Sequence, residues 1–143
     1  MNFIFQAHSG LRYLVLLAGI AAALVMAAGL FSRRAAYDRP ARTAMAVFAG
    51  VLDLQIVLGI VLVALGVFYP SLIGHLTMML LAAAAVHAAS VLARKQGDPR
   101  RAYSLGLIGA VLALLLMVLG IHAIGRGVFE GRDAPSAGVE SAR

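Results

Sequence analysis

The chain of 143 residues contains no cysteine and no tryptophan, and only 13% of its residues are charged. The absence of cysteine excludes structural disulfides, thiolate metal sites and cysteine-attached haem. Soluble domains carry about 25% charged residues, so this scarcity, together with 62% hydrophobic residues, is typical of a membrane protein. Lysine and arginine outnumber aspartate and glutamate by 12 to 6, but they lie between long apolar runs and are not interleaved with aromatics. That placement disfavours a nucleic-acid surface and indicates the lipid bilayer as the partner.

Four apolar runs follow one another along the chain, at about residues 3–31, 43–68, 71–93 and 103–124. Each is long enough, at about 20 residues or more, to cross a bilayer as a helix. The first run lacks the basic start of a cleavable signal, so we expect it to be retained. Residues 1–125 are therefore predicted to form an all-α, antiparallel bundle of four transmembrane helices, and residues 126–143 a polar tail outside the membrane.

The basic residues predict how this bundle is oriented. Eight of the 12 lie in the stretches 32–42 and 94–101, whereas the short connection around Tyr69 and Pro70 has none. Because cytoplasmic loops carry the excess of lysine and arginine, both basic loops are expected in the cytoplasm and both termini outside. In a bacterium this describes a multi-pass protein of the cytoplasmic (inner) membrane with its termini on the periplasmic side.

Three of the four histidines are expected near the outer ends of three different helices: His8, His75 and His122. Neutral imidazoles that project from facing helices are usual ligands of haem b iron, so all three are candidate iron ligands. Arg12 lies one turn after His8 and could pair with a haem propionate, which adds it to the candidate cofactor site. Met79 lies one turn after His75 and is a weaker candidate ligand, for haem or for copper.

A second polar constellation is predicted deeper in the membrane. His87 lies about 18 Å along the helix from His75 and points about 120° away from it. Asp53 falls at a similar depth on the preceding helix, so a buried Asp53–His87 pair would satisfy both polar groups. The pair could be a structural hydrogen bond or part of a second site. Gln55 is two residues further along and should point elsewhere.

Three stretches resemble a family of small bacterial four-helix membrane proteins that are often labelled cytochrome b-like: HSGLRY (8–13), DLQIVLG (53–59) and GHLTMMLLAAAAVH (74–87). The resemblance implies that His8, Arg12, Asp53, Gln55, His75 and Met79 match the family pattern. This chain departs from that pattern at Gly74, where members have an acidic residue, and lacks the Pro-Trp that follows their last helix.

These observations favour a haem b-binding protein of membrane electron transfer, an electron carrier or subunit rather than a stand-alone enzyme, with quinone as a second candidate cofactor. The alternative is a non-catalytic accessory subunit of a respiratory or photosynthetic membrane complex, whose histidines hydrogen-bond to protein, lipid or a pigment. The partner, besides lipid, would be a larger membrane redox complex or further copies of this chain in a homo-oligomer. In that interpretation His8 and His122 contact lipid headgroups, and Arg12 extends towards water. A zinc hydrolase is disfavoured because the chain has no HExxH motif.

Overall fold

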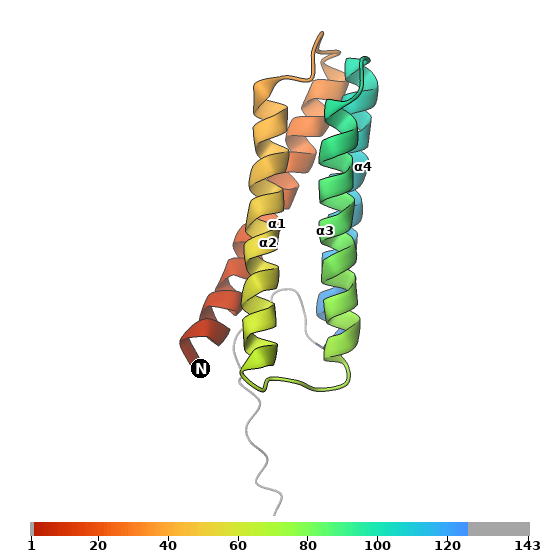
Figure 1. Cartoon of the computed structure of the whole chain (residues 1–143). Coiled ribbons are helices and arrows are strands. Elements are labelled where there is room, and N and C mark those ends of the chain that lie inside the picture. Colours follow the sequence, from red (N-terminus) through yellow and green to blue (C-terminus); the bar gives the residue numbers. More distant parts are fainter. Residues whose placement is uncertain (1, 126–143) are drawn as a thin grey trace, which may run out of the picture.

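The structure, a computed structural model, describes residues 2–125 and contains four helices. These are α1 (Asn2–Phe31), α2 (Arg39–Ala64), α3 (Leu72–Arg94) and α4 (Pro99–Ala123), shown in Figure 1. All four are long and apolar enough to cross a membrane, which confirms the prediction of an all-helical bundle of the multi-pass membrane type. The tail predicted for residues 126–143 lies outside the described residues.

Two of the helices begin about four residues earlier than the apolar pattern predicts, because each has an aspartate cap followed by proline. Asp38 accepts a hydrogen bond from the backbone N–H of Ala41 at 3.1 Å, and Asp98 accepts one from Arg100 N–H at 3.0 Å. Proline occupies the first turn of both helices, where its missing N–H costs nothing. At its other end α2 stops at Ala64, four residues before the predicted end, since Gly66 adopts a φ of 93° that helices do not use.

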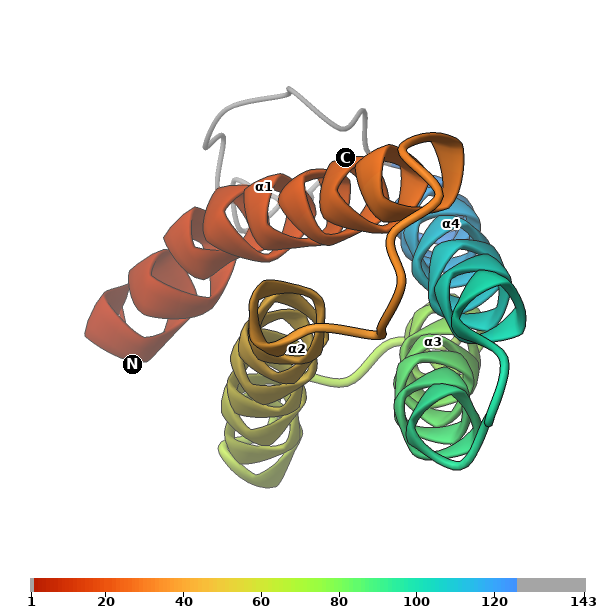
Figure 2. The same ribbon diagram turned by 90° about the horizontal axis from the view of Figure 1, so that it is seen from above.

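The connections after α1 and after α3 lie at one end of the bundle, and the connection between α2 and α3 lies at the other (Figure 1). Seen from above, α1 runs past one side of α2 and reaches α4, while α3 stands beside α4 (Figure 2). The packing is uneven, because α3 contacts α4 extensively but contacts α2 much less. The boundary between α2 and α3, called here the α2–α3 seam, is therefore the loosest of the main interhelical contacts.

Small side chains explain the close approach of α3 and α4. A methyl group added at Gly109 would overlap the side chain of Ala89 and lie 3.2 Å from the carbonyl oxygen of Ala85. Packing of this kind drives helix association in lipid, where burial of apolar surface from water contributes little. Larger side chains of the core are also fully buried; they include Val15 and Met26 of α1, Met45, Phe48 and Leu52 of α2, and Val86 of α3.

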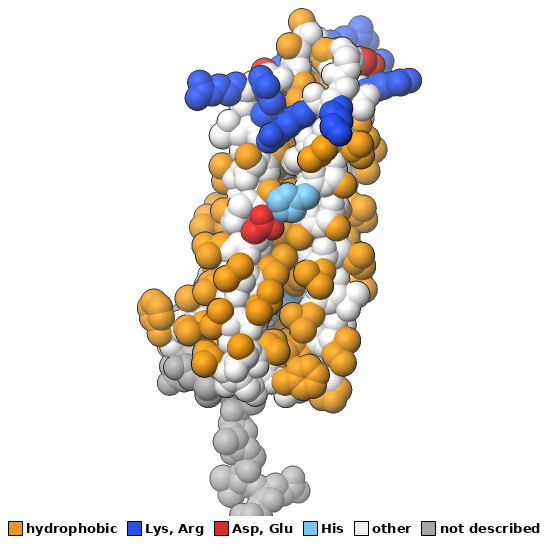
Figure 3. Space-filling view, viewed as in Figure 1, with side chains coloured by type: hydrophobic (Ala, Val, Ile, Leu, Met, Phe, Trp, Pro, Cys, Tyr) orange, Lys and Arg blue, Asp and Glu red, His pale blue; other side chains and the backbone are white. Residues whose placement is uncertain are grey.

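The outer surface of the bundle is apolar along most of its length, with arginine and lysine gathered at one end (Figure 3). Large side chains that are more than half exposed occur on every helix, among them Leu24, Ile60, Leu80 and Ile108. A soluble protein rarely exposes so much contiguous apolar surface, so lipid is the natural contact for this surface. The end that carries the connections after α1 and α3 is called the basic end below.

At the basic end, α4 is fixed to the connection after α1 by Tyr103, which is 1% exposed. Its hydroxyl donates to the carbonyl oxygen of Ala36 at 3.2 Å. Its ring meets that of Tyr37 edge-on, with centroids 5.2 Å apart. This contact holds residues 36–38 in place above the ends of the helices.

Candidate functional site

A cavity of about 500 Å³ opens between α2 and α3 in the half of the bundle opposite the basic end. Its wall is almost entirely apolar, and its polar lining is small: His8 from α1, Gln55 from α2, His75 from α3 and Tyr69 from the connection between α2 and α3. This space is called the histidine cavity below. Gln55 lies nine residues before the end of α2, so the cavity extends about 14 Å inward from that end.

His8 and Gln55 form a connected set of hydrogen bonds at the deep end of the histidine cavity. The His8 Nδ1 atom lies 3.2 Å from the backbone oxygen of Gln55. The Gln55 side chain in turn donates from Nε2 to the backbone oxygen of His8 at 2.9 Å, and the same atom lies 3.4 Å from His8 Nε2. Gln55 is only 7% exposed, so these bonds satisfy its side-chain N–H groups where water does not reach, whereas its Oε1 atom is buried with no hydrogen-bond partner among residues 2–125.

Gly59 provides the room that the His8 ring occupies. A methyl group at this position would come within 3.2 Å of His8 Cε1, tighter than ordinary van der Waals contact. Because Gly59 lies one turn after Gln55, the same face of α2 offers both the hydrogen-bonding amide and the space beside it. The two residues together fix where the imidazole lies.

His75 is held in a comparable way near the shallow end of the cavity. Its Nδ1 lies 2.9 Å from the backbone oxygen of Gly120 in α4. A carbonyl oxygen can only accept, so the Nδ1 atoms of both His8 and His75 carry the hydrogen, and each Nε2 is left with its lone pair. Imidazoles that bind metals commonly have this arrangement, with the distal nitrogen bonded to a backbone carbonyl.

The structure does not bring His122 to this site. Its ring is exposed, and its Nδ1 donates to the carbonyl oxygen of Val118 in its own helix at 2.9 Å. Gly120, whose carbonyl binds His75, is buried and lies two residues away, about 200° around the helix. His122 therefore faces away from the His8 and His75 rings, although it lies at a depth similar to that of His75.

Arg12 and Met79 have different surroundings from those expected of ligands. The Arg12 guanidinium stacks on the ring of Tyr13, 4.8 Å from its centroid, and donates to the Tyr13 hydroxyl at 2.8 Å; it does not line the histidine cavity. Met79 does line the cavity but is 7% exposed, with its terminal methyl directed at Gly120. Met79 is thus a packing residue in this arrangement, as methionine commonly is in irregular cores.

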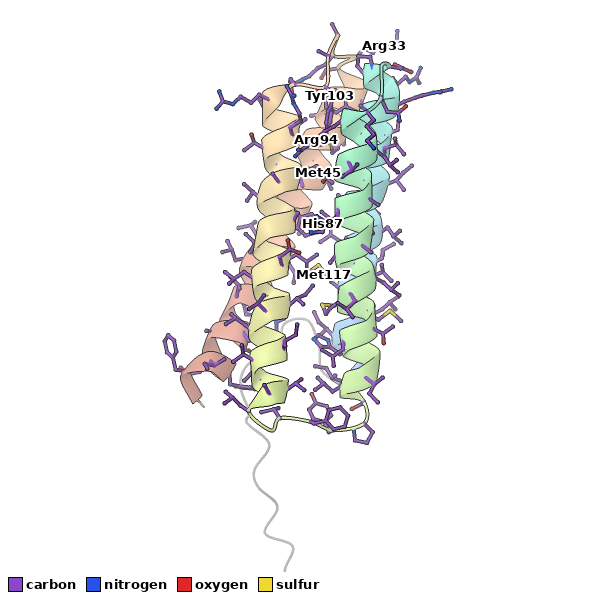
Figure 4. All side chains as sticks on the ribbon, viewed as in Figure 1. Arg33, Met45, His87, Arg94, Tyr103 and Met117 are labelled. Atoms are coloured by element: carbon purple, nitrogen blue, oxygen red, sulfur yellow. The ribbon has the colours of Figure 1, made fainter. Side chains whose placement is uncertain are left out.

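Asp53 and His87 meet across the α2–α3 seam, with His87 Nε2 at 3.0 Å from each Asp53 carboxylate oxygen. The sequence predicted a buried pair, but the structure exposes 53% of the His87 side chain and 48% of the Asp53 side chain. The reason is the loose contact between α2 and α3, which leaves the pair at the surface. Figure 3 shows an acidic and a histidine side chain side by side within the apolar surface, and Figure 4 places His87 midway along α3.

Gly59 is a site residue that sequence reasoning missed, and so is the contact between Gln55 and His8. Gln55 does point away from the Asp53–His87 pair, as expected, but no partner is predicted for it from the sequence. The signal was present as an amide in the middle of an apolar helix, followed one turn later by glycine. The contact is hard to predict because His8, the seventh residue of α1, is expected near the membrane interface. In the structure it lies deeper, beside Gln55.

Comparison with known protein families, characterised proteins and solved structures finds no match to this chain. Within residues 2–125 no cluster of three or more histidine, aspartate or glutamate side chains has metal-binding geometry. The histidine cavity and its pair of imidazoles therefore provide the basis for a functional proposal.

Proposed function

We propose that this protein is a haem b-binding membrane protein of electron transfer, in which His8 and His75 would hold the haem iron. The observation that supports the proposal is the shared cavity: two imidazoles from different helices line one apolar space, each with its Nδ1–H bonded to a backbone carbonyl. Bis-imidazole ligation between helices of a bundle is a usual way to hold haem b.

The residues present fit such a group. The volume of about 500 Å³ lies within the range of about 300–1,000 Å³ typical of ligand pockets, and its wall is apolar. The carbonyl bonds fix the tautomers and the orientations of the two rings, so that both Nε2 lone pairs are available. Binding through His8 requires its Nε2 to give up the contact of 3.4 Å with the Gln55 amide, which is longer than a normal hydrogen bond.

A bound haem would supply a one-electron redox centre, and the chain would supply position and environment. The apolar wall lowers the local dielectric constant and excludes water, which tunes the reduction potential. A membrane quinol is the donor that we propose, because it dissolves in the same apolar phase.

The orientation forms part of the proposal. The basic end carries the arginine- and lysine-rich connections, so the positive-inside rule supports an antiparallel bundle with this end in the bacterial cytoplasm and both termini in the periplasm. The histidine cavity would then open towards the periplasmic half of the inner membrane, and the protein would pass electrons at that side.

The test is the absorption spectrum of full-length protein, expressed with ample haem and purified in mild detergent. We expect a Soret band and a sharp band on reduction, both lost in His8→Ala and His75→Ala. His122→Ala and His87→Ala are matched controls that should keep the spectrum, because both rings lie outside the cavity. Added imidazole should restore the bands to His75→Gly, which separates loss of a ligand from loss of the fold.

Colourless wild-type protein would overturn the proposal, as would bands that survive in both His8→Ala and His75→Ala.

A second candidate function, an accessory subunit of a larger membrane complex, is favoured by the half-exposed Asp53–His87 pair. A polar pair that faces lipid is costly, and a partner helix that covered it would remove that cost. Purification in gentle detergent should then recover the chain in fixed stoichiometry with other subunits. Recovery as a haem-containing protein alone would count against this candidate.

A further inference from the structure

Two adjoining cavities lie at the basic end, and both are lined by Arg42 of α2 and Arg94 of α3. The smaller cavity, about 260 Å³, is partly open and is lined by residues of both connections, which include Tyr37 and Gln96. The larger, about 480 Å³, is a wide-open hollow that continues along α2 past Thr43. Figure 4 places Arg94 near the basic end of α3. These two cavities are together called the arginine pocket.

The two arginines of the pocket carry positive charge that no carboxylate of the described residues neutralises in an ion pair. Among the residues that the structure describes, the salt bridges are Arg34–Asp38 and His87–Asp53, and no carboxylate pairs with Arg42 or Arg94. Two guanidinium groups that line the same space repel one another unless an anion lies between them. Arginine forms paired hydrogen bonds with phosphate oxygens particularly well, owing to its planar fork of donors.

A buried hydroxyl in the same pocket also points to a ligand. The Tyr37 hydroxyl oxygen is buried and has no hydrogen-bond partner among residues 2–125, although Tyr37 lines the smaller cavity. A buried polar group without a partner costs about 1–3 kcal/mol, so such a group calls for an explanation. Burial raises the pKa of Tyr37, so the phenol stays protonated and can donate.

We propose that the arginine pocket binds the phosphate group of an anionic phospholipid, with Arg42 and Arg94 on the phosphate oxygens and Tyr37 donating a further hydrogen bond. Basic pockets between transmembrane helices near the cytoplasmic surface are suited to such headgroups. This site is separate from the histidine cavity and does not depend on haem.

The larger cavity indicates a lipid rather than a soluble phosphate. It leads from the arginines towards the apolar middle of the bundle, along Ala46 and Val47, and Val47 is 51% exposed. One turn further, a methyl group added at Gly50 would meet nothing within 4 Å, so the surface there is open. An acyl chain can follow this path along the α2–α3 seam while its phosphate stays between the arginines.

The test is native mass spectrometry of full-length, delipidated protein in a neutral detergent, titrated separately with phosphatidylglycerol, phosphatidylcholine and inorganic phosphate. We expect phosphatidylglycerol to bind at least about tenfold more tightly than phosphatidylcholine. Arg42→Gln and Arg94→Gln should each weaken phosphatidylglycerol binding by about 10- to 100-fold, the range for loss of a charged hydrogen bond. Tyr37→Phe should weaken it by about two- to tenfold.

Arg101→Gln is the matched control, because Arg101 is exposed at the same end but does not line the pocket. It should leave binding unchanged, which separates a specific site from general attraction between the basic end and anionic lipid. Circular dichroism of each variant checks that the helices are retained. Equal effects of all three arginine variants would overturn the proposal. Inorganic phosphate that binds as tightly as phosphatidylglycerol would show an anion site without lipid specificity and would also overturn it.

Discussion

The contact between Asp53 and His87 across the α2–α3 seam leads to a quantitative prediction about how the bundle holds together. His87 Nε2 lies 3.0 Å from both carboxylate oxygens, yet about half of each side chain is exposed. Exposed ion pairs in water contribute about 0.2–1 kcal/mol. Polar pairs between transmembrane helices contribute about 0.6 kcal/mol on average and up to about 1.7. The half-exposed position therefore predicts a coupling free energy of about 0.6–1.7 kcal/mol in a bilayer and a smaller one in micelles.

The measurement is a double-mutant cycle with Asp53→Ala, His87→Ala and the double variant. Each single variant leaves one polar partner facing lipid, so the double variant should cost less than the sum of the two singles. The free energy of unfolding, measured by denaturing-detergent titration in bicelles and then in micelles, supplies the four values. Asp53→Ala combined with His122→Ala is the control cycle, because His122 bonds within its own helix and should show additivity.

Coupling below about 0.3–0.5 kcal/mol cannot be distinguished from ordinary additivity. Such a value in bicelles would refute the claim that this pair joins α2 to α3. A coupling free energy above this limit in the Asp53–His87 cycle, together with one below it in the control cycle, would support the claim. Coupling that fails to increase from micelles to bicelles would refute the argument that lipid exposure strengthens the pair.

Two further predictions concern the helix contacts and caps. Gly109→Ala should lower the free energy of unfolding by about 1–3 kcal/mol, because the added methyl group overpacks against Ala89. Gly50→Ala has open space in front of it and should be neutral or stabilising by up to about 1 kcal/mol. Equal effects of the two variants in a detergent-unfolding titration would contradict the packing argument. For Asp38, partial desolvation raises the carboxyl pKa, but hydrogen bonds from Ala41 N–H and the Arg34 side chain outweigh it and hold the pKa below its ordinary value. A carboxyl with a lowered pKa contributes stability above its unfolded value of about 3.9 and loses it as the pH falls through the folded value. Asp38→Ala should therefore lower the free energy of unfolding by about 1 kcal/mol at pH 7, through the lost cap, and by less in more acidic solution. Asp38→Asn should keep the cap but lose this pH dependence. An identical pH profile of stability for wild type and Asp38→Asn would contradict this assignment.

The fold was accessible to sequence reasoning because lipid imposes a simple rule. A spanning segment must satisfy its own backbone hydrogen bonds, so long apolar runs indicate helices directly, and the structure confirms four of them. The helix ends were less predictable. Apolar runs measure the hydrocarbon thickness, whereas Asp38 and Asp98 with their prolines begin α2 and α4 in the polar region beyond it.

The candidate site was predictable only in part, because depth can be read from sequence more easily than direction. The helical rise predicts that His8, His75 and His122 lie towards the same end of the bundle, but rotation about the helix axis separates His122 from the other two. The rotation depends on which face of α4 packs against α3, and that choice rests on small residues such as Gly109 and Gly120. The tilt of α1, which brings His8 to Gln55, leaves no mark in its own periodicity.

The loose contact between α2 and α3 has a consequence for how molecules reach the interior. The histidine cavity, the Asp53–His87 pair and the arginine pocket all lie along this one boundary, while the contacts of α1 with α2, of α1 with α4 and of α3 with α4 close the remaining sides. A hydrophobic molecule dissolved in the bilayer can thus approach all three laterally, without crossing either aqueous face. Traffic along this route would pass the Asp53–His87 contact, which bridges α2 and α3. A pair of modest strength would thus set how readily the interior exchanges with the lipid around it.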